Sequence, residues 1–162
     1  NCLKNLSENS LREARYSVLF SLGEKNKFDF IALGHTQDDQ IETILFRLIR
    51  GSGIAGLRGI PFKRQIYIRP LLNVSKLECR NFLSQLGIVE WIEDSTNQQN
   101  HYARNRIRNE LIPLCEKIHP GFSLGIITTN AIVEEENAFL DRLAYQWFEQ
   151  NQTNNGIKIE GF

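Results

Sequence analysis

Apolar residues near the start of the chain recur at helical spacing and predict a helix from Ser10 to Leu22. The repeating positions are Leu11, Ala14, Val18, Leu19 and Leu22. Ser10 and Glu13 have the spacing of a capping box, whose side chains satisfy free backbone amides of the first helical turn. Gly23 is a typical helix end, because glycine leaves the helical conformation easily.

A short strand and a second helix are predicted next. Residues 29–34 contain the continuous apolar run from Phe30 to Leu33, which is typical of a strand buried on both faces of a parallel sheet. The second helix has one apolar face and ends at Gly51. That face consists of Ile41, Ile44, Leu45, Leu48 and Ile49.

The region after the second helix continues the alternation of helix and strand. Three non-helical segments are predicted there: a glycine-spaced loop over residues 51–59 and strands over 66–68 and 88–92. Ser75 and Glu78 form the second capping box and open a helix that Gly87 closes. This order favours an α/β fold, a layered Rossmann-like domain with a mainly parallel sheet.

From about Tyr102 the pattern is helical only. One apolar stripe consists of Ala103, Ile107, Leu111 and Leu114. A further helix is predicted from Ser123 to Gln150, and His119-Pro120-Gly121 separates the two. We therefore expect one domain over residues 1–118 and the helical start of a second over residues 119–162.

The composition favours a folded protein. With 162 residues, 41% of them hydrophobic and 23% charged, the chain is long enough for one core and the start of a second. No apolar run approaches the roughly 20 residues of a membrane span, and the polar start is unlike a signal peptide. The cysteines, Cys2, Cys79 and Cys115, suit a reducing compartment better than disulfides or a metal site. Because there is no methionine, we expect the chain to be part of a longer protein.

The formal net charge is zero, yet the charges are unevenly distributed. Residues 41–80 hold eight Lys and Arg against two Asp and Glu, whereas residues 121–162 hold two against six. We expect an anionic partner to bind the middle of the chain, although solvated helix faces explain such charge runs about as well.

The segment between the predicted strand and the second helix is the most informative for chemistry. It lies at the carboxyl edge of the sheet, where α/β proteins bind ligands. His35 supplies an acid or base, and Asp38, Asp39 and Glu42 supply oxygens for magnesium. The alternative is that Thr36, Asp38 and Asp39 only cap the helix. A zinc site is not expected, because no second histidine or thiol accompanies His35.

A run of arginines, Arg104-Asn105-Arg106-Ile107-Arg108, lies on the helix predicted after residue 102. On a helix Arg104 and Arg108 lie one turn apart, so that both can point outward while Ile107 is buried. Guanidinium groups placed in this way suit phosphate oxygens. Ordinary surface arginines are the alternative.

Several short motifs follow one another in an order that is more specific than any of them alone. They are Arg12-Glu13-Ala14-Arg15-Tyr16, Ala32-Leu33-Gly34-His35, Asp38-Asp39-Gln40, Glu42-Thr43, residues 47–56, Arg69-Pro70-Leu71, Glu93-Asp94-Ser95-Thr96-Asn97 and residues 104–108. The order resembles that of the tRNA(Ile)-lysidine synthetases over roughly residues 10–118. Residues 121–162 resemble only in a general way the helical start of that family's next domain.

The resemblance implies an ATP-dependent ligase of the N-type ATP pyrophosphatases. Such an enzyme adenylates the C2 oxygen of the wobble cytidine in a tRNA(Ile) with a CAU anticodon, and the ε-amine of lysine then displaces AMP to give lysidine. ATP, Mg²⁺, lysine and tRNA(Ile) are thus the expected cofactors and partners. The expected location is the cytoplasm or a plastid stroma, without a membrane, and a homo-oligomer is left open.

One part of the family pattern is missing from this sequence. The family holds the phosphates with a Ser-Gly-Gly-x-Asp-Ser loop near the amino terminus, and no such loop occurs here. The glycines of residues 51–59 match neither GxxxxGK[ST] nor GxGxxG and predict an ordinary loop. We therefore expect these 162 residues to be inactive by themselves.

Carried over by position, the resemblance implies three sets of site residues. They are a catalytic set of Arg15, His35 and Asp39, a nucleotide or metal set of Gly34, Asp38 and Glu42, and a tRNA set of Arg104, Asn105, Arg106 and Arg108. Many family members have a second histidine where this chain has Thr36, so Thr36 is given no catalytic role.

Two alternatives remain. A tRNA thiolase of the same superfamily is expected to use paired cysteines, and the three cysteines of this chain form no pair in sequence. A non-enzymatic RNA-binding module would keep the basic run and do no chemistry.

Overall fold

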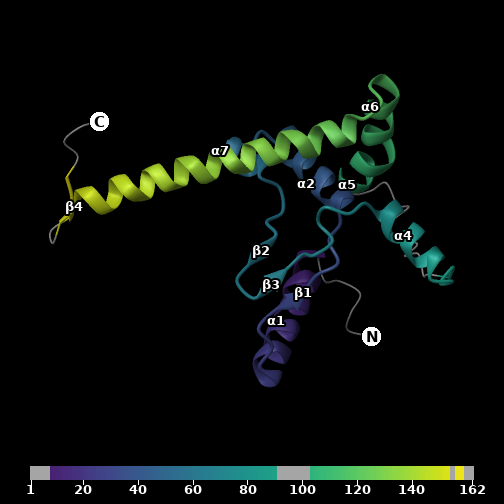
Figure 1. The fold of residues 1–162 in the computed structure, drawn as a ribbon, viewed down its shortest axis with the longest axis horizontal. Coiled ribbons are helices and arrows are strands. Elements are labelled where there is room, and N and C mark those ends of the chain that lie inside the picture. The colour runs from purple at the N-terminus through teal and green to yellow at the C-terminus, as the bar shows by residue number, and fades with distance from the viewer. Residues whose placement is uncertain (1–7, 91–102, 154–155, 159–162) are drawn as a thin grey trace.

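The structure, a computed structural model, describes residues 8–90, 103–153 and 156–158 (Figure 1). Its helices are α1 (Glu8–Asn26), α2 (Gln37–Ile49), α3 (Ile54–Leu57), α4 (Lys76–Gln85), α5 (Ala103–Arg106), the π-helix η2 (Ile107–Leu111), α6 (Ile112–Ile118) and α7 (Phe122–Asn151). Its strands are β1 (Ile31–Ala32), β2 (Lys63–Arg64), β3 (Tyr67–Ile68), β4 (Gln152–Thr153) and β5 (Gly156–Ile157).

Three short strands form the sheet that carries the site. Their order is β1-β3-β2, with β1 parallel and β2 antiparallel to β3, while β4 and β5 pair separately. Residues 31–32 pair with residues 67–68, which confirms the strands predicted within 29–34 and 66–68. The fold is α/β, as expected. The sequence does not predict β2, because two residues are too short for a recognisable alternation.

Helix α1 packs closely against this sheet at Gly23. A Cβ atom on residue 23 would lie 3.1 Å from Ile31 Cδ1 and 3.6 Å from Ile66 Cδ1. The prediction that Gly23 ends the helix is wrong, because α1 continues to Asn26 and uses the missing side chain for close packing. The capping box predicted at Ser10 is also wrong, since Ser10 already lies inside α1.

Strand β1 is less buried than the sequence predicts. Ile31 is partly buried, Ala32 is exposed, and Phe30 just before the strand is 50% exposed. Neighbouring strand residues point to opposite faces. Burial on both faces is therefore wrong for the described residues: the face with Ile31 is covered by α1, and the face with Ala32 is open.

Helix α2 forms the centre of the hydrophobic core. Ile41 and Leu45 of α2 form a buried cluster with Ile107 of η2. Partly buried side chains pack around it, namely Phe46, Leu111, Ile112, Phe122, Ile126 and Ile127. Leu48 and Ile49 are 53% and 63% exposed, so the predicted apolar face ends one turn early, where the described helices leave the end of α2 open.

Residues 103–118 form a continuous helical segment, as predicted, with η2 at its centre. Ile107 is buried, but Ala103 and Leu114 are exposed, so the predicted apolar stripe packs only in its middle. The wider turn of a π-helix changes the spacing at which residues share a face, so a straight stripe does not continue across it.

The capping box of α4 is confirmed. The Glu78 amide donates to Ser75 Oγ at 3.1 Å, and Glu78 Oε2 accepts from the Ser75 amide at 2.8 Å. Gly87, with a φ of 76°, follows the helix end. The strand predicted over residues 88–92 is wrong for 88–90, which follow this turn without pairing; residues 91 and 92 lie outside the described residues, as does the motif at 93–97.

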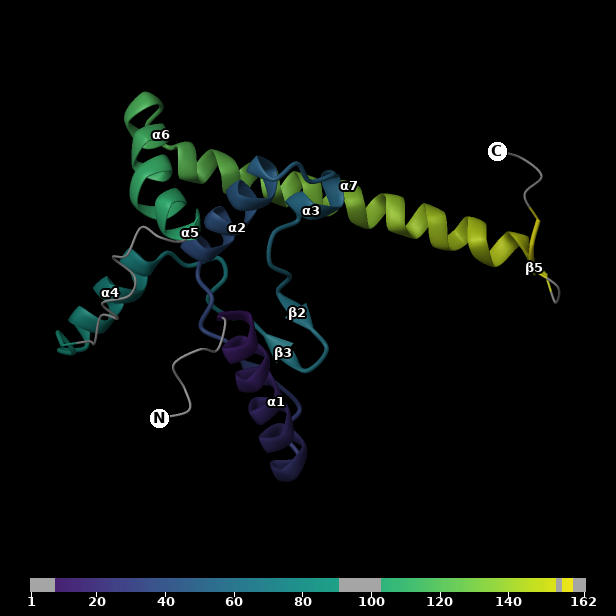
Figure 2. The ribbon, with the colours of Figure 1, turned by 180° about the vertical axis from the view of Figure 1, so that it is seen from behind.

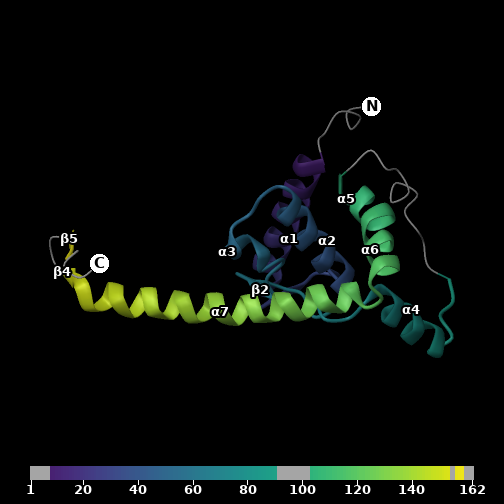
Figure 3. The same ribbon diagram turned by 90° about the horizontal axis from the view of Figure 1, so that it is seen from above.

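The thirty-residue helix α7 follows Gly121, whose φ is 91°. Its first half runs along α2 and α3, and its second half extends away from the other helices (Figure 2). Seen from above, α1, α2 and α6 lie on the same side of α7 (Figure 3). The helix predicted from Ser123 to Gln150 is confirmed, and the domain division at residue 118 stays a prediction. Within the described ranges, no helix combines the length and apolarity that a bilayer span requires.

Candidate functional site

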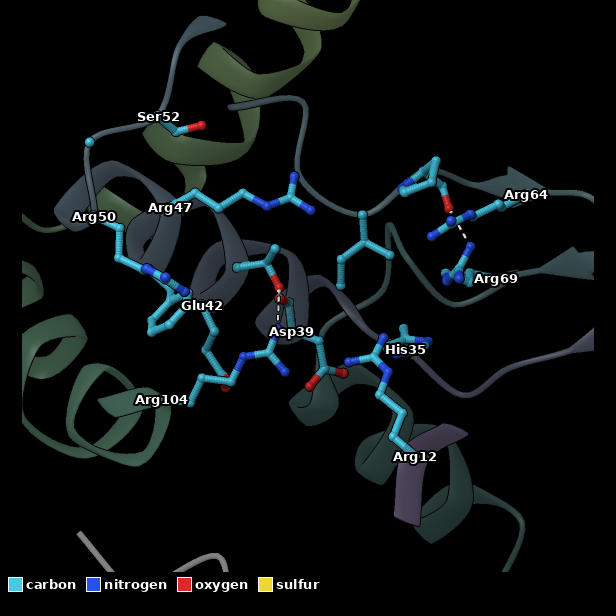
Figure 4. Close-up of a pocket in the computed structure, with 15 residues that line it drawn as sticks. Arg12, His35, Asp39, Glu42, Arg47, Arg50, Ser52, Arg64, Arg69 and Arg104 are labelled. Atoms are coloured by element: carbon cyan, nitrogen blue, oxygen red, sulfur yellow. Dashed lines mark hydrogen bonds between the residues drawn. The ribbon is translucent and has the colours of Figure 1, made fainter. Parts of the chain in front are cut away.

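A cleft of about 610 Å³ opens beside the carboxyl end of β1 (Figure 4). It lies between α1, α2 and the segment from residue 50 to the β2–β3 hairpin. The lining residues are Arg12, His35, Asp39, Glu42, Thr43, Phe46, Arg47, Arg50, Gly51, Ser52, Ile60, Pro61, Arg64, Arg69 and Arg104. Of the predicted site residues, the structure thus brings together His35, Asp39, Glu42 and Arg104.

The cleft is strongly cationic. Its six arginines outnumber its two carboxylates, Asp39 and Glu42. Four of the arginines come from residues 41–80, where the sequence shows its positive excess. A concave surface with this balance concentrates anions such as phosphate groups.

His35 lies just before α2, and its Nδ1 atom is buried without a hydrogen-bond partner among the described residues. Burial lowers the pKa of His35 most, and the positive charge of Arg69 lowers it further; Asp39 acts in the opposite direction. The imidazole is therefore neutral at pH 7, and one ring nitrogen is available to accept a proton.

Arg69 follows β3 and is only 4% exposed. Its Nη1 donates to the Pro61 carbonyl at 2.7 Å, while its Nε is buried and has no partner in the described part of the chain. Buried donors without partners are rare. Arg69 Nε and His35 Nδ1 both belong to side chains that line the cleft.

Arg47, by contrast, holds the loop beside the cleft. Its Nη1 donates to the carbonyls of Gly56 and Gly59 at 2.8 and 2.7 Å. The predicted loop over residues 51–59 therefore has a fixed shape and contains α3, a single helical turn that the glycine spacing does not reveal.

Asp39 makes the capping contact and lies in the cleft, while its role in chemistry stays a prediction. Its carboxylate accepts from the amide and hydroxyl of Thr36 at 2.8 and 3.0 Å, which is the predicted capping contact of α2. Asp39 also lines the cleft. Burial raises the pKa of Asp39, but the Thr36 hydrogen bonds and the charge of Lys76 outweigh it and keep the pKa below the usual value. Asp39 is thus ionised at neutral pH.

Glu42 is buried and held by Arg108. Arg108 Nε donates to Glu42 Oε1, and Arg108 Nη2 donates to Oε2 at 2.9 Å. This hydrogen bonding raises the pKa of Arg108. Because both oxygens of Glu42 are engaged, the side chain is poorly suited to bind magnesium. Across the residues that the structure describes, no three His, Cys, Asp or Glu side chains gather into a metal site.

The arginine run does not face outward as predicted. Arg104 and Arg108 do share a face, but it contacts α2: Arg104 Nη2 donates to Thr43 Oγ1 at 3.2 Å, and Arg108 binds Glu42. The outward orientation is therefore wrong for Arg108, which is partly buried on the carboxylate of Glu42, whereas Arg104 is exposed and also reaches the Thr43 hydroxyl.

The two other members of this run lie outside the cleft lining. Arg106 is exposed and pairs with Glu110 at 3.2 Å, and Asn105 is partly buried. Contact of Arg104, Asn105, Arg106 and Arg108 with tRNA stays a prediction.

Arg15, Gly34 and Asp38 also lie outside the cleft lining. Arg15 and Gly34 are exposed. Asp38 Oδ2 accepts from the Lys76 amide at 2.7 Å and so stabilises the start of α4, as capping would. The catalytic and nucleotide-binding roles of these residues stay predictions.

Five arginines of the cleft are missing from the predicted site residues, namely Arg12, Arg47, Arg50, Arg64 and Arg69. Arg47 and Arg50 lie within the motif of residues 47–56. Arg12 and Arg69 stand inside motifs of the resemblance, and Arg69 directly follows a predicted strand, which are signals that would have identified them. Arg64 has no such signal, because β2 is not recognisable in the sequence.

Family comparison supports the class that this fold and cleft suggest. The model of the PP-loop domain matches residues 3–115. The chain therefore belongs to the PP-loop family, which confirms the superfamily expected from the motif order.

Similar curated proteins are more specific. The chain is 48% identical over 115 residues to the tRNA(Ile)-lysidine synthase of Borrelia garinii subsp. bavariensis, covering 71% of this chain and 26% of that protein. It is 36% identical over 150 residues to the enzyme of the same name from Nostoc sp., covering 89% and 44%. The chain thus spans less than half the length of these relatives.

Among solved structures, the U34-tRNA thiolase NcsA from Methanococcus maripaludis with its [4Fe-4S] cluster is similar in fold. The TM-score is 0.58 at 19% sequence identity, and the match covers 83% of this chain and 46% of that one. At this identity the likeness shows the fold alone.

Proposed function

We propose that this chain is part of a tRNA(Ile)-lysidine synthetase, which ligates lysine to C2 of the wobble cytidine of a CAU-anticodon tRNA(Ile) at the expense of ATP. The observation that carries the proposal is that neutral His35 and buried Arg69, whose Nε has no partner among the described residues, line one cationic cleft. A carbonyl-activating ligase needs a base beside a phosphate site, and the named relatives support this chemistry.

The reaction has two steps. In the first, the C2 oxygen of cytidine attacks the α-phosphorus of ATP, the new oxygen–phosphorus bond forms, and pyrophosphate leaves. In the second, the ε-amine of lysine attacks C2, the carbon–oxygen bond to AMP breaks, and the amine loses a proton. Lysidine, AMP and pyrophosphate are the products.

The cleft residues supply the groups that these steps need. Arg69 and Arg12 would stabilise the negative charge that develops on the α-phosphate, because guanidinium groups bind two phosphate oxygens at once. His35 would accept the amine proton, since its lowered pKa keeps it neutral. The ionised Asp39 would orient the lysine ammonium group, which loses one proton to solvent before the neutral amine attacks; His35 takes the second proton, released on attack. Magnesium would be held by the phosphates rather than by Glu42.

Lysine-dependent AMP release from ATP, with a CAU-anticodon tRNA(Ile) transcript, tests this proposal in the full-length protein. His35→Ala and Asp39→Asn should abolish turnover and leave tRNA affinity within a few fold. His119→Ala is the matched control, because His119 is exposed at the α6–α7 junction, away from the cleft lining. Intact turnover in either cleft variant would mean that the substituted residue only caps the helix or packs, and has no catalytic role.

A second arm tests the need for a phosphate-binding loop. Displacement of pyrophosphate requires several backbone amides around the leaving group, and the sequence offers no loop of that type. We expect the 162 residues alone to release no AMP and to gain activity when a segment carrying a Ser-Gly-Gly-x-Asp-Ser loop is supplied. Full activity of the chain alone would move the nucleotide site to residues 51–59.

Thiolation is the competing reaction, since the structural neighbour is a thiolase. In the described part, Cys79 lies on α4 and Cys115 on α6, and neither lines the cleft. Transfer of labelled sulfur to tRNA, with no lysine requirement, would favour that reaction over ligation.

A further inference from the structure

A second groove joins the cleft on the side of α1. Its volume is about 500 Å³, and it lies between α1 and the β2–β3 hairpin. Arg12, Arg64 and Arg69 line both hollows. The two therefore adjoin at these three arginines, and we name the second one the aromatic groove after Tyr16, Phe20 and Tyr67 in its lining.

One ring of the aromatic groove is held in place by its neighbours. Arg12 Cζ lies 5.6 Å from the centre of the Tyr16 ring, and Tyr67 meets that ring edge-on at 5.0 Å and 69°. The Tyr67 hydroxyl donates to the Tyr16 carbonyl at 3.0 Å. Tyr16 is thus fixed before any ligand arrives, which lowers the entropy cost of binding a flat partner.

The ring next to it is open. Phe20 lies one helical turn beyond Tyr16 on α1 and is 43% exposed. An aromatic surface beside a phosphate site is the arrangement with which proteins bind unpaired nucleotides, because every base has a flat face that stacks on a ring.

We propose that the aromatic groove holds one unpaired RNA nucleotide adjacent to the nucleotide that reacts in the cleft. Its base would lie against Tyr16 and Phe20, and the phosphate linking the two nucleotides would bind Arg64, next to Arg12 and Arg69, which would face the α-phosphate of ATP. The inference rests on the proposed function and deepens it, since it assigns a second subsite for the RNA substrate.

Three observations favour an RNA strand over a free nucleotide. Two adjoining hollows of about 610 and 500 Å³ suit two linked nucleotides better than one. Their shared boundary consists of arginines, at the place where a linking phosphate would lie. Phe20 lines only the second hollow and is 43% exposed, so a second base would have its own ring on which to stack.

The test measures binding of an anticodon stem-loop RNA and of ATP, separately, to the full-length protein. Phe20→Ala and Tyr16→Ala should weaken RNA binding by about 5- to 100-fold, the usual effect of losing a stacked base, and leave ATP binding unchanged. Tyr16→Phe keeps the ring and should bind RNA within about twofold of the unaltered protein. Phe139→Ala is the matched control, because Phe139 is 53% exposed on the far half of α7.

A fluorescent base locates the stacked nucleotide. With 2-aminopurine next to the wobble position, binding should quench its fluorescence in the unaltered protein and in Tyr16→Phe, and not in Phe20→Ala. Arg64→Ala should flatten the salt dependence of RNA binding by about one unit of log-log slope.

Each outcome decides the inference. Weaker ATP binding with intact RNA binding in Phe20→Ala would assign the aromatic groove to a free nucleotide, and unchanged binding of both would leave it without a ligand role; either overturns the proposal. Phe20 is exposed, so its variant tests the idea even where Tyr16→Ala lowers stability. Normal lysine-dependent AMP release together with full RNA affinity in Phe20→Ala would contradict this inference alone, whereas RNA binding without AMP release in the unaltered protein would contradict the proposed function alone.

Discussion

Removing either partner of the Glu42–Arg108 pair should destabilise the protein, and removing the arginine should cost more. The Glu42 side chain is 4% exposed and the Arg108 side chain 30% exposed. Arg108→Ala leaves a buried carboxylate without its two charge-assisted hydrogen bonds. Glu42→Gln leaves a guanidinium that is partly in water and still lies 3.6 Å from Asp39 Oδ1.

The magnitudes follow from this asymmetry. Breaking a buried pair by removing one partner costs about 3–5 kcal/mol, and Arg108→Ala should fall near the lower end, about 3 kcal/mol, because the pair is not fully enclosed. Glu42→Gln keeps one acceptor for Arg108 and should cost about 1 kcal/mol. A loss of about 3 kcal/mol is a large part of a typical free energy of unfolding of 5–15 kcal/mol.

Urea unfolding, followed by far-ultraviolet circular dichroism, measures both effects. Arg106→Ala is the matched control: Arg106 precedes the same π-helix, but its pair with Glu110 is exposed, with side-chain accessibilities of 67% and 48%, and should contribute less than about 0.5 kcal/mol. Equal losses in Arg108→Ala and Glu42→Gln, or a larger loss in the latter, would refute the reasoning from burial.

Three further predictions concern His35, Gly59 and Asn130. Burial lowers the pKa of His35, so the unfolded chain binds a proton at this residue more readily than the folded one. The free energy of unfolding should be highest above pH 6.5 and should fall as the pH drops through the lowered pKa. Urea unfolding at several pH values should show that His35→Gln removes this loss. Gly59→Ala should destabilise by about 1–3 kcal/mol more than Gly51→Ala in thermal melts, because both have positive φ but only at Gly59 would the new Cβ collide with Gln40, 2.5 Å from its Oε1. Asn130→Ala should cost about 1–3 kcal/mol and speed hydrogen exchange in α3, because it removes the partner of Gln40 and the donor to an α3 carbonyl; slow exchange in that variant would contradict the link.

Features set by neighbouring residues could be predicted from the sequence. The capping box of α4 joins Ser75 to Glu78 within one turn, so the local pattern contains the whole interaction. Gly23 shows the limit of such patterns. Glycine both ends helices and allows close packing, and only the contact with Ile31 in β1 decides between the two.

The electrostatics of the site depend on distant residues and could not be predicted in this way. The spacing of Arg104 and Arg108 correctly gives a shared face, but the direction of that face depends on Thr43 and Glu42 of α2, more than sixty residues earlier in the chain. The motif order located His35 and Asp39 in the cleft. It did not predict that Arg69 Nε is buried without a partner among the described residues, because the burial of Arg69 arises only in the folded chain.

The long helix α7 has a mechanical consequence. Asn130, its ninth residue, accepts from Gln40 Nε2 at 3.1 Å and donates to the Leu57 carbonyl at 2.8 Å, so the helix is fastened close to the cleft. A second contact, the 3.2 Å pair of Arg58 with Asp141, holds the helix further along. Ten residues of α7 follow Asp141 and extend for about 15 Å. Among the described residues this end of α7 is a short lever, and a tilt of about 5° at Asp141 displaces its tip by about 1 Å. Gln40 also hydrogen-bonds the backbone of Ile60 at the cleft wall. A tilt of α7 is therefore transmitted to that wall through the side chains of Asn130 and Gln40.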